Sequence, residues 1–351
     1  MIYYICMEEQ RMITISVCMI VKNEEAILGQ CLDSLSGIPD EVIIVDTGST
    51  DHTKEIAAHY TDKIYSFPWN GDFSSARNFA FSKASMEYIY SADADESLDE
   101  ENRCKFLRLK QDLPPSTELV QMRYSNLGQY NTVYNFKAEF RPKLFRRLRT
   151  FHWIDPVHET VDLNIHMVNS DITILHHPES SHASRDFSLL KYAAEKGHLN
   201  MRLIRMYAKE LFISGTSHDF LEAYPFFEPI LHDENAPLDE VRTAQCVVTH
   251  TALLRNDSAM MFKTALKNVI GEPSAEVCCD LGAYFADTGD FEEAATWYYT
   301  AASGAQSELD IHTSGNIPLL CLARCYDKLD MPSEAENCRF RAKNWTPPQG
   351  D

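Results

Sequence analysis

A short β-prone run that ends in three carboxylates most constrains how this chain can fold. The run extends from Tyr88 to Ala92, and Asp93, Asp95 and Glu96 follow it, with one alanine between the two aspartates. Such a run is typical of a buried strand that delivers acids to the edge of an α/β sheet, where ligands bind beyond the carboxyl ends of the strands. Two carboxylates at positions i and i+2 can share a divalent cation that holds a diphosphate. The same pattern also occurs in solvated turns that cap helices, so it needs support from the rest of the chain.

The residues before this motif alternate between strand and helix patterns. β-branched apolar runs of strand length occupy residues 13 to 21, 41 to 46 and 63 to 67. Apolar residues at helical spacing separate them, and the first helix, through residues 27 to 35, is expected to carry Glu24-Glu25 in its first turn, where negative charge suits the helix dipole. Strand, helix and strand in this order form a parallel, right-handed unit. The pattern therefore predicts an α/β fold.

Acidic residues recur where these units end. Asp46 closes the second strand, and Asp72 precedes a helix that is expected to begin near Phe73. Together with the acids after residue 92, they mark the sheet edge where a nucleotide would bind. Arg77 lies off the apolar stripe of that helix, and two roles stay open: reaching a phosphate or carboxylate of the site, or a salt bridge that tethers its own helix. The chain contains neither GxGxxG nor GxxxxGK[ST], which disfavours dinucleotide dehydrogenases and phosphate-loop NTPases.

Composition excludes several other classes of protein. A length of 351 residues suggests about two domains, and 44% hydrophobic with 24% charged residues is ordinary for a globular protein. The formal charge of −20 argues against nucleic acid or an anionic membrane as partner. We expect no membrane span and no signal peptide, and hence a cytoplasmic protein with residues 1–12 as an N-terminal extension. Ten scattered cysteines, including Cys321 and Cys325 one helical turn apart, are interpreted as reduced packing residues rather than a metal site.

Four motifs, in this order, resemble family 2 glycosyltransferases of the GT-A fold. They are CMIVKNEE at 18–25, IVDTGSTD at 44–51, GDFSSARN at 71–78 and DADE at 93–96. A subgroup of that family is further matched by KLFR at 143–146, Trp153, VHE at 157–159 and ITILH at 172–176. The resemblance covers roughly residues 13–180 and implies a GT-A glycosyltransferase domain with a mixed central sheet.

The resemblance also implies a reaction and a site. The reaction is transfer of a sugar from a nucleotide-diphosphate sugar, expected to be a UDP-sugar, with inversion at the anomeric carbon and a divalent metal, Mg²⁺ or Mn²⁺. Asp46 would contact the nucleotide base, Asp93 would lie near the ribose, and Asp95 would bind the metal, with His176 as a further ligand. The residues expected to form the nucleotide-sugar site are Val21, Asn23, Glu24, Asp46, Gly48, Arg77, Asp93, Ala94 and Asp95.

An inverting transfer needs a base on the acceptor side, opposite the leaving diphosphate. We predict Glu159 for this role, with His158 and Asp155 as the alternatives. A purely structural role also stays open, in which Glu159 pairs with Arg146 or Arg147 and holds neighbouring strands together.

The segment between the acids and this base offers fewer signals. Residues 97 to 140 contain no motif, and alternating runs such as 118 to 124 are interpreted as strands around the acceptor side. Residues 141 to 149 hold five basic residues in nine. One interpretation is an edge strand protected by charge, and the other places some of these cations beside the diphosphate or an acidic acceptor.

After Pro178 the pattern becomes helical, and residues 185–345 are predicted to form an all-α domain of repeats similar to tetratricopeptide repeats. An offset of about 41 residues aligns Leu281 with Leu322 and Ala294 with Ala335. Such repeats bury a core by stacking and leave a concave face. That face suits a peptide or another subunit, whereas in the simpler interpretation the array only supports the catalytic domain or forms a homodimer.

Three functions remain on these grounds. The first is a glycosyltransferase that modifies a cysteine or serine side chain of a peptide or protein, because peptide S-glycosyltransferases that act on bacteriocin precursors look similar in combining this domain with helical repeats. The second is a sugar transferase of the lipopolysaccharide type, acting on a lipid-linked or polysaccharide acceptor. The third is a non-catalytic scaffold that binds peptides through its repeats, which the intact acids disfavour.

Overall fold

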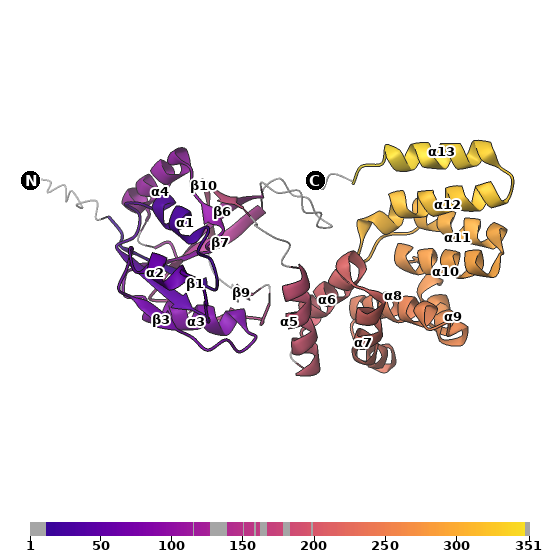
Figure 1. The fold of residues 1–351 in the computed structure, drawn as a ribbon, viewed down its shortest axis with the longest axis horizontal. Helices are drawn as coiled ribbons and strands as arrows, with labels where there is room; N and C mark the ends of the chain where they lie inside the picture. The colour runs from indigo at the N-terminus through magenta and orange to yellow at the C-terminus, as the bar shows by residue number, and fades with distance from the viewer. Residues whose placement is uncertain are drawn as a thin grey trace, which may run out of the picture. The chain divides into compact units, whose positions relative to one another are not determined.

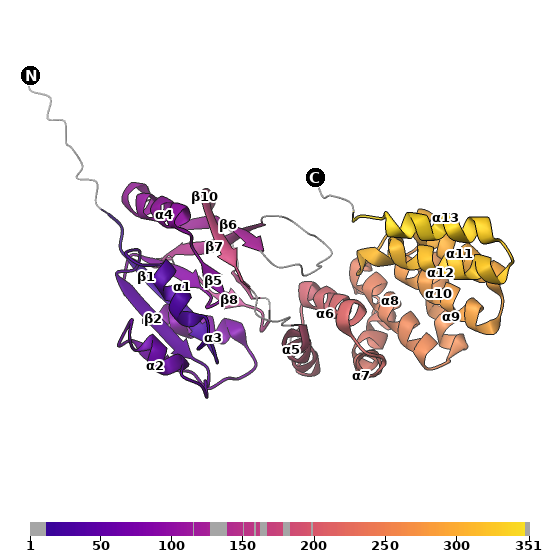
Figure 2. The ribbon, with the colours of Figure 1, turned by 45° about the horizontal axis from the view of Figure 1, so that its top comes forward.

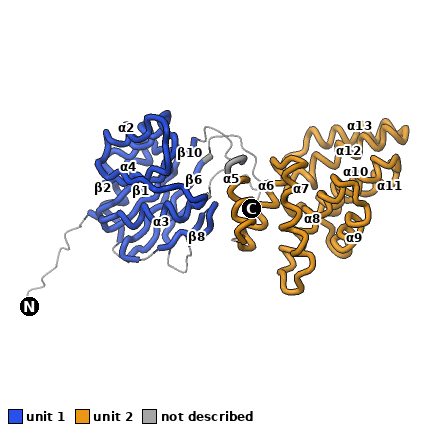
Figure 3. Tube along the Cα trace, turned by 60° about the horizontal axis from the view of Figure 1, so that its bottom comes forward, with its two compact units in different colours: residues 1–131, 136–181 blue, residues 132–135, 182–351 orange. Residues whose placement is uncertain are grey.

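The computed structural model describes residues 12–114, 116–126, 139–149, 151–157, 159–161, 167–177, 183–197 and 199–347. The chain divides into two compact units, shown in different colours in Figure 3. Unit 1 comprises residues 1–131 and 136–181, and unit 2 comprises residues 132–135 and 182–351.

Unit 1 is built on a mixed sheet (Figure 1). Its strands are β1 (Ile15–Val21), β2 (Glu41–Asp46), β3 (Ile64–Ser66), β4 (Tyr88–Ala92), β5 (Glu96–Ser97), β6 (Leu119–Asn126), β7 (Glu139–Arg146), β8 (Trp153–Ile154), β9 (Thr160–Val161) and β10 (Met167–His176). Eight of the described strands form one sheet in the order β3-β2-β1-β4-β7-β6-β10-β5, and β8 and β9 form a separate hairpin. The first four strands in this order are parallel, β7 is antiparallel to both of its neighbours, and β5 is antiparallel to β10.

Helices cover both faces of this sheet. They are α1 (Leu28–Ser34), α2 (Thr53–Ala57), α3 (Phe73–Lys83) and α4 (Glu100–Asp112). Strand residues alternate between the two faces because the side-chain period of a strand is two. In β1, Val17 and Met19 join the core under α1, α2 and α4, whereas Cys18 joins the core that includes Ala80 of α3 and Trp153 of β8. The central strands are buried on both sides, as their apolar runs predict.

The structure confirms the predicted α/β class with a mixed sheet and corrects three details. Helix α4 was not predicted, although Asp99 caps its N-terminus by accepting a hydrogen bond from the Asn102 amide. Helix α1 begins at Leu28, so Glu24-Glu25 precede it instead of lying in its first turn. Strand β7, which carries the basic segment, lies between β4 and β6 and is therefore not an edge strand.

The described part of unit 2 consists of helices. They are α5 (Ala183–Glu195), α6 (Met201–Ser214), α7 (Ser217–Phe227), α8 (Leu238–Leu254), α9 (Ser258–Val269), α10 (Ala275–Thr288), α11 (Phe291–Ser303), α12 (Asn316–Lys328) and α13 (Pro332–Lys343), with short 3-10 helices η1 (Glu228–His232) and η2 (Ile311–Ser314). Helices α10 to α13 lie side by side as two successive hairpins (Figure 2). In the described residues, no helix is long and apolar enough to span a membrane.

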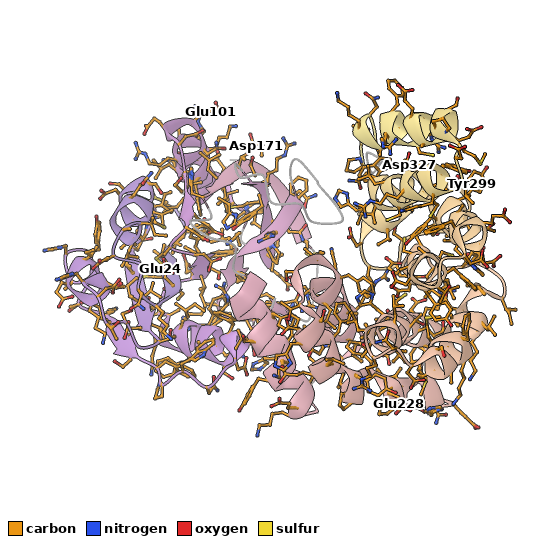
Figure 4. The ribbon with its side chains drawn as sticks, turned by 45° about the vertical axis from the view of Figure 1, so that its right-hand side comes forward. Glu24, Glu101, Asp171, Glu228, Tyr299 and Asp327 are labelled. Carbon is orange, nitrogen blue, oxygen red and sulfur yellow. The ribbon has the colours of Figure 1, made fainter. Side chains whose placement is uncertain are left out.

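The two hairpins repeat the same packing. Leu281 and Leu322 are buried at equivalent places in α10 and α12, and Ala294 and Ala335 are buried in α11 and α13. Gly289 ends α10 with a φ of 86°, in the left-handed region that favours glycine. The predicted all-α repeat region is therefore confirmed. Tyr299 on α11 and Asp327 on α12 both lie on the exposed surface of this array (Figure 4).

The cysteines of this region behave as packing residues. Cys321 and Cys325 join the core between α10 and α13, and burial raises the pKa of both thiols. A thiol that stays protonated is a poor nucleophile and a poor metal ligand. This agrees with the interpretation made from the sequence.

Candidate active site

The loops after β1 and β2 are bound to each other by side-chain hydrogen bonds. The Asn23 carboxamide accepts from the Thr50 amide at 2.8 Å, and the Asn23 amide donates to Ser49 Oγ at 3.0 Å. The Glu24 amide donates to Thr53 Oγ1 at 2.8 Å, in the loop where Figure 4 labels Glu24. Asn23 has a φ of 57°, and asparagine is among the few residues that adopt this conformation readily. The KNEE and DTGSTD motifs therefore build one surface at the carboxyl ends of the two strands.

Asp46 organises the second of these loops. Its side chain is buried and accepts hydrogen bonds from the amides of Gly48 at 3.2 Å and Ser49 at 3.1 Å, and Lys54 Nζ lies 3.1 Å from Oδ2. Burial alone would raise the pKa of Asp46, but the hydrogen bonds from Ser49, Lys54 and Gly48 outweigh it and lower the pKa. Gly48 has a φ of 110°, which allows its amide to turn back towards the carboxylate.

Five side chains of alternating charge form a series of ion pairs at the end of β4. Arg77 of α3 donates to Glu159 through Nε and to Asp93 Oδ1 through Nη2, the latter at 2.7 Å. The second oxygen of Asp93 lies 3.5 Å from Lys143 Nζ, and Lys143 also forms an ion pair with Glu96. The order is therefore Glu159, Arg77, Asp93, Lys143 and Glu96.

These contacts shift the pKa values of three of these groups. Burial would raise the pKa of Asp93, but the charges of Arg77 and Lys143 outweigh it and hold the pKa well below its usual range. Burial would lower the pKa of Arg77, and the charges of Asp93 and Glu159 instead raise it. Burial raises the pKa of Glu96, and Lys143 offsets only part of that effect. The two cations therefore favour the ionised form of Asp93, whose side chain is 30% exposed.

Asp95 and His176 come together because β5 pairs with β10. In that pairing His176 lies opposite Glu96, and the His177 amide donates to the Asp95 carbonyl at 2.9 Å. The His176 Nε2 and Asp95 Oδ2 atoms are 3.0 Å apart. The imidazole also packs against Tyr124 of β6, with ring centroids 5.0 Å apart.

This pair fits a divalent cation. Ligands about 2.1 Å from an octahedral ion lie about 3.0 Å from each other, which is the spacing of the Asp95 and His176 atoms. A carboxylate oxygen and an imidazole nitrogen are donors that Mn²⁺ accepts. Within the described ranges, no three His, Cys, Asp or Glu side chains are grouped to hold a metal. The protein would therefore supply two donors, as is common where substrate phosphates and water complete the shell.

The remaining predicted site residues have other surroundings. The Val21 side chain lies in the core, and its carbonyl accepts from the Thr47 amide at 3.0 Å. Ala94 is buried between the two aspartates. Asp155 has a φ of 75° in the turn between β8 and β9, and His158 lies outside the described residues. Asp72 caps α3 by accepting from the Ser75 amide at 3.2 Å, which is a structural role.

Residues of β7, β4 and β6 complete the site without having been singled out in the sequence. Lys143 was noted in a basic segment and in the KLFR motif but not as a site residue, and Ser91, which accepts from Arg77 Nη1 at 3.0 Å, was interpreted only as a strand residue. Arg141 stacks over the Tyr124 ring at 3.9 Å. The KLFR motif, and a lysine inside an apolar strand pattern, were the available signals for Lys143. The structural alternative, in which Glu159 pairs with Arg146 or Arg147, is wrong, since its partner is Arg77.

A hollow of about 410 Å³ lies away from these acids, where β2 and β3 begin. Its lining includes Leu35, Pro39, Tyr60 and Lys63. It is therefore distinct from the edge at which the strands end.

The part of the chain that carries this edge is similar to known proteins. Residues 16–165 match the family described as Glycosyl transferase family 2. A "TPR repeat-containing protein" of Synechococcus elongatus is 35% identical over 160 residues, which are 43% of this chain and 36% of that protein. The "lipopolysaccharide core biosynthesis glycosyltransferase LpsC" of Rhizobium meliloti is 34% identical over 144 residues, 38% of this chain and 51% of that protein.

A third relative is the "SPbeta prophage-derived glycosyltransferase SunS" of Bacillus subtilis, 37% identical over 98 residues, 27% of this chain and 23% of that protein. The chain thus spans about half or less of the length of these relatives. The matched residues contain all of β1 except Ile15, and all of β2 to β9, with Asp46, Asp93, Asp95 and Glu159. Residues 16–165 are therefore similar to glycosyl transferase family 2 domains.

Proposed function

We propose that this protein is an inverting, metal-dependent glycosyltransferase that uses a nucleotide-diphosphate sugar. The resemblance to family 2 glycosyltransferases favours a UDP-sugar as the donor. One observation carries the proposal. Arg77 links Asp93 and Glu159 at the carboxyl end of β4, inside residues 16–165 that match the family, and the side chain of Asp95 lies 3.0 Å from that of His176 of β10.

Each group has a role on the donor side. Asp46 and the backbone of Asn23 and Gly48 form the surface for the nucleotide base, and Asp93 accepts hydrogen bonds from the ribose hydroxyls. Asp95 and His176 would hold Mg²⁺ or Mn²⁺, which supplies positive charge to the departing diphosphate. Asp93 suits its role because its ionised carboxylate can accept further hydrogen bonds while Arg77 holds one oxygen.

Glu159 acts on the acceptor side as the general base. A base in an inverting transfer removes the proton from the attacking hydroxyl or thiol while the diphosphate leaves from the opposite face. Glu159 directly precedes β9, and its side chain is paired with Arg77 and 12% exposed. The carboxylate is therefore fixed in place while an acceptor can still reach it. Asp155, in the neighbouring turn, is the alternative among the described residues.

The Asp95→Ala variant tests the donor side. We expect UDP with Mg²⁺ or Mn²⁺ to stabilise the wild-type protein against unfolding, because a ligand that binds only the folded state must do so. The variant should lose the metal-dependent part of the affinity measured by calorimetry. Equal affinity with and without metal, in both proteins, would refute this assignment.

Two acceptor classes follow from different observations. The helical repeats of unit 2 favour a peptide or protein acceptor modified at a cysteine or serine, because stacked repeats present a concave face that suits peptides. The relative LpsC, by its name, acts in lipopolysaccharide core biosynthesis, which favours a lipid-linked or polysaccharide acceptor. Assays with a labelled donor against a peptide library and against lipid-linked sugars would distinguish them.

A scaffold without catalysis is the remaining alternative. It predicts that the protein does not hydrolyse any nucleotide sugar in a panel of donors, with or without metal. Slow, metal-dependent hydrolysis that disappears in Asp95→Ala would exclude it.

A further inference from the structure

Arg77 connects the two sides of the candidate site. Its Nε donates to Glu159, its Nη2 to Asp93 at 2.7 Å and its Nη1 to Ser91 at 3.0 Å. The guanidinium also lies over the ring of Trp153, 5.0 Å from its centroid. With all three nitrogens engaged and the side chain 11% exposed, Arg77 is occupied by protein partners instead of being available to a phosphate.

The hairpin that carries Glu159 is attached to the same helix by its backbone. The Asn78 carboxamide accepts from the Trp153 amide and donates to the Trp153 carbonyl, both at 2.9 Å. The Phe73 amide at the start of α3 donates to the Pro156 carbonyl at 2.9 Å. These contacts fix the backbone before Glu159, but they do not involve its side chain.

The Glu159 carboxylate therefore depends on Arg77 for its orientation. Within the described residues, Arg77 is the side chain that bonds to it. A planar guanidinium fixes direction as well as charge, because its donors form a rigid fork, whereas an ammonium is a point charge on a flexible stem. Arg77 can bridge Glu159 and Asp93 at once for the same reason.

We propose that Arg77 is a positioning residue, which aims the Glu159 carboxylate at the acceptor and holds it in a fixed relation to Asp93 on the donor side. The proposal rests on the function proposed above, and it makes Arg77 act on the transfer through Glu159. It does not require contact between Arg77 and the donor.

The Arg77→Lys variant tests this inference while keeping the positive charge. A lysine cannot serve both carboxylates in the same geometry, so we expect kcat to fall tenfold or more, whereas the calorimetric affinity for UDP with Mn²⁺ changes less than about threefold. In a Glu159→Gln background the same substitution should have no further effect on kcat, because Arg77 acts through Glu159. A general loss of structure would instead lower the affinity and the activity together in every background.

Arg103→Lys is the matched control, since Arg103 of α4 also pairs with a carboxylate, Glu100, through two nitrogens but away from the site. This control substitution should leave kcat and the affinity for UDP with Mn²⁺ unchanged. Thermal unfolding of each variant shows whether it is folded.

The outcomes separate the inference from the proposed function. Wild-type turnover in Arg77→Lys, with turnover lost in Glu159→Gln, would overturn the inference and leave the proposed function intact. Independent, multiplicative losses from the two substitutions would also overturn it. Absence of UDP binding and of donor turnover in the wild-type protein would overturn the proposed function, and the inference with it.

Discussion

At the scale of single residues, the partners of each carboxylate distinguish acids that bind a ligand from acids that shape the backbone. Asp72 accepts hydrogen bonds from the Ser75 amide and from the hydroxyls of Ser74 and Ser75. Both of its carboxylate oxygens are therefore engaged in capping the helix N-terminus. Asp93 faces two cations and keeps 30% of its side chain exposed. Both aspartates follow a strand in the sequence, so only their hydrogen-bond and ion-pair partners distinguish them.

Glu159→Gln should separate binding from turnover. The amide keeps the shape of the side chain and removes the base, so we expect turnover to fall by roughly 10²-fold or more and the affinity for the nucleotide sugar to stay nearly unchanged. Steady-state kinetics with calorimetry on the same preparation measures both. Turnover close to that of the wild type would move the role of base to Asp155 or His158.

His250 in unit 2 should make stability depend on pH. Its Nδ1 lies 2.7 Å from Asp280 Oδ1, and its ring packs against Phe220 with centroids 4.4 Å apart. Burial would lower the pKa of His250, but the charge and hydrogen bond of Asp280 outweigh it, so the pKa is raised. A raised pKa in the folded state means that this contribution is complete below the unfolded value of about 6.5 and is lost as the pH rises through the folded value.

The measurement is denaturant unfolding at several pH values from about 6 upward. The difference in unfolding free energy between the wild type and His250→Gln should shrink as the pH rises. His218→Gln, at an exposed position of α7, is the control and should follow the wild type. A difference that does not vary with pH would contradict the assignment.

At the scale of elements, the approach of α10 to α11 depends on a glycine. A Cβ at Gly282 would lie 2.9 Å from the ring of Tyr298, which is buried in α11. Alanine favours a helix over glycine by about 1 kcal/mol, but overpacking costs about 1–3 kcal/mol. We therefore expect Gly282→Ala to lower the free energy of unfolding despite its better helix propensity.

Gly29→Ala in α1 is the matched substitution. Its Cβ would meet Tyr60 at 3.6 Å and Ile56 at 3.8 Å, which are ordinary contacts. It should therefore be neutral or stabilising by up to about 1 kcal/mol. Chemical denaturation of both variants tests the comparison, and equal effects would show that the Tyr298 ring does not limit the packing.

At the scale of the whole molecule, we propose that the two units have separate functions. Unit 1 binds the donor, and unit 2 determines the acceptor or mediates dimerisation. A chain that ends near Arg185 retains the acids, Arg77 and β10. If that chain is folded, it should bind UDP with metal as tightly as the full protein does. Circular dichroism checks folding and calorimetry measures binding, and lost affinity in a folded truncation would contradict the division.

The sequence by itself determined the parts of this protein that depend on local pattern. Apolar runs of strand length placed β1, β2 and β4, because a strand buried on both faces must be apolar throughout. Helical spacing and Gly289 placed α10 and α11, since each hairpin needs an apolar stripe and a turn residue. Motif order identified the family 2 domain, which the matched residues 16–165 confirm.

Only the tertiary structure decided which charges meet. Glu159 lies 82 residues from Arg77, and Lys143 lies 47 residues from Glu96, so no local pattern reports either pair. The order of strands in the sheet determines the first pair, because β7 lies beside β4 and brings Lys143 to the acids. The packing of the β8–β9 hairpin on α3 determines the second, because it brings Glu159 to Arg77. Pairing of β5 with β10 likewise sets His176 against Asp95. These contacts arise from long-range strand pairing and helix packing, whose partners are fixed by the fold as a whole and not by the spacing of residues along the chain.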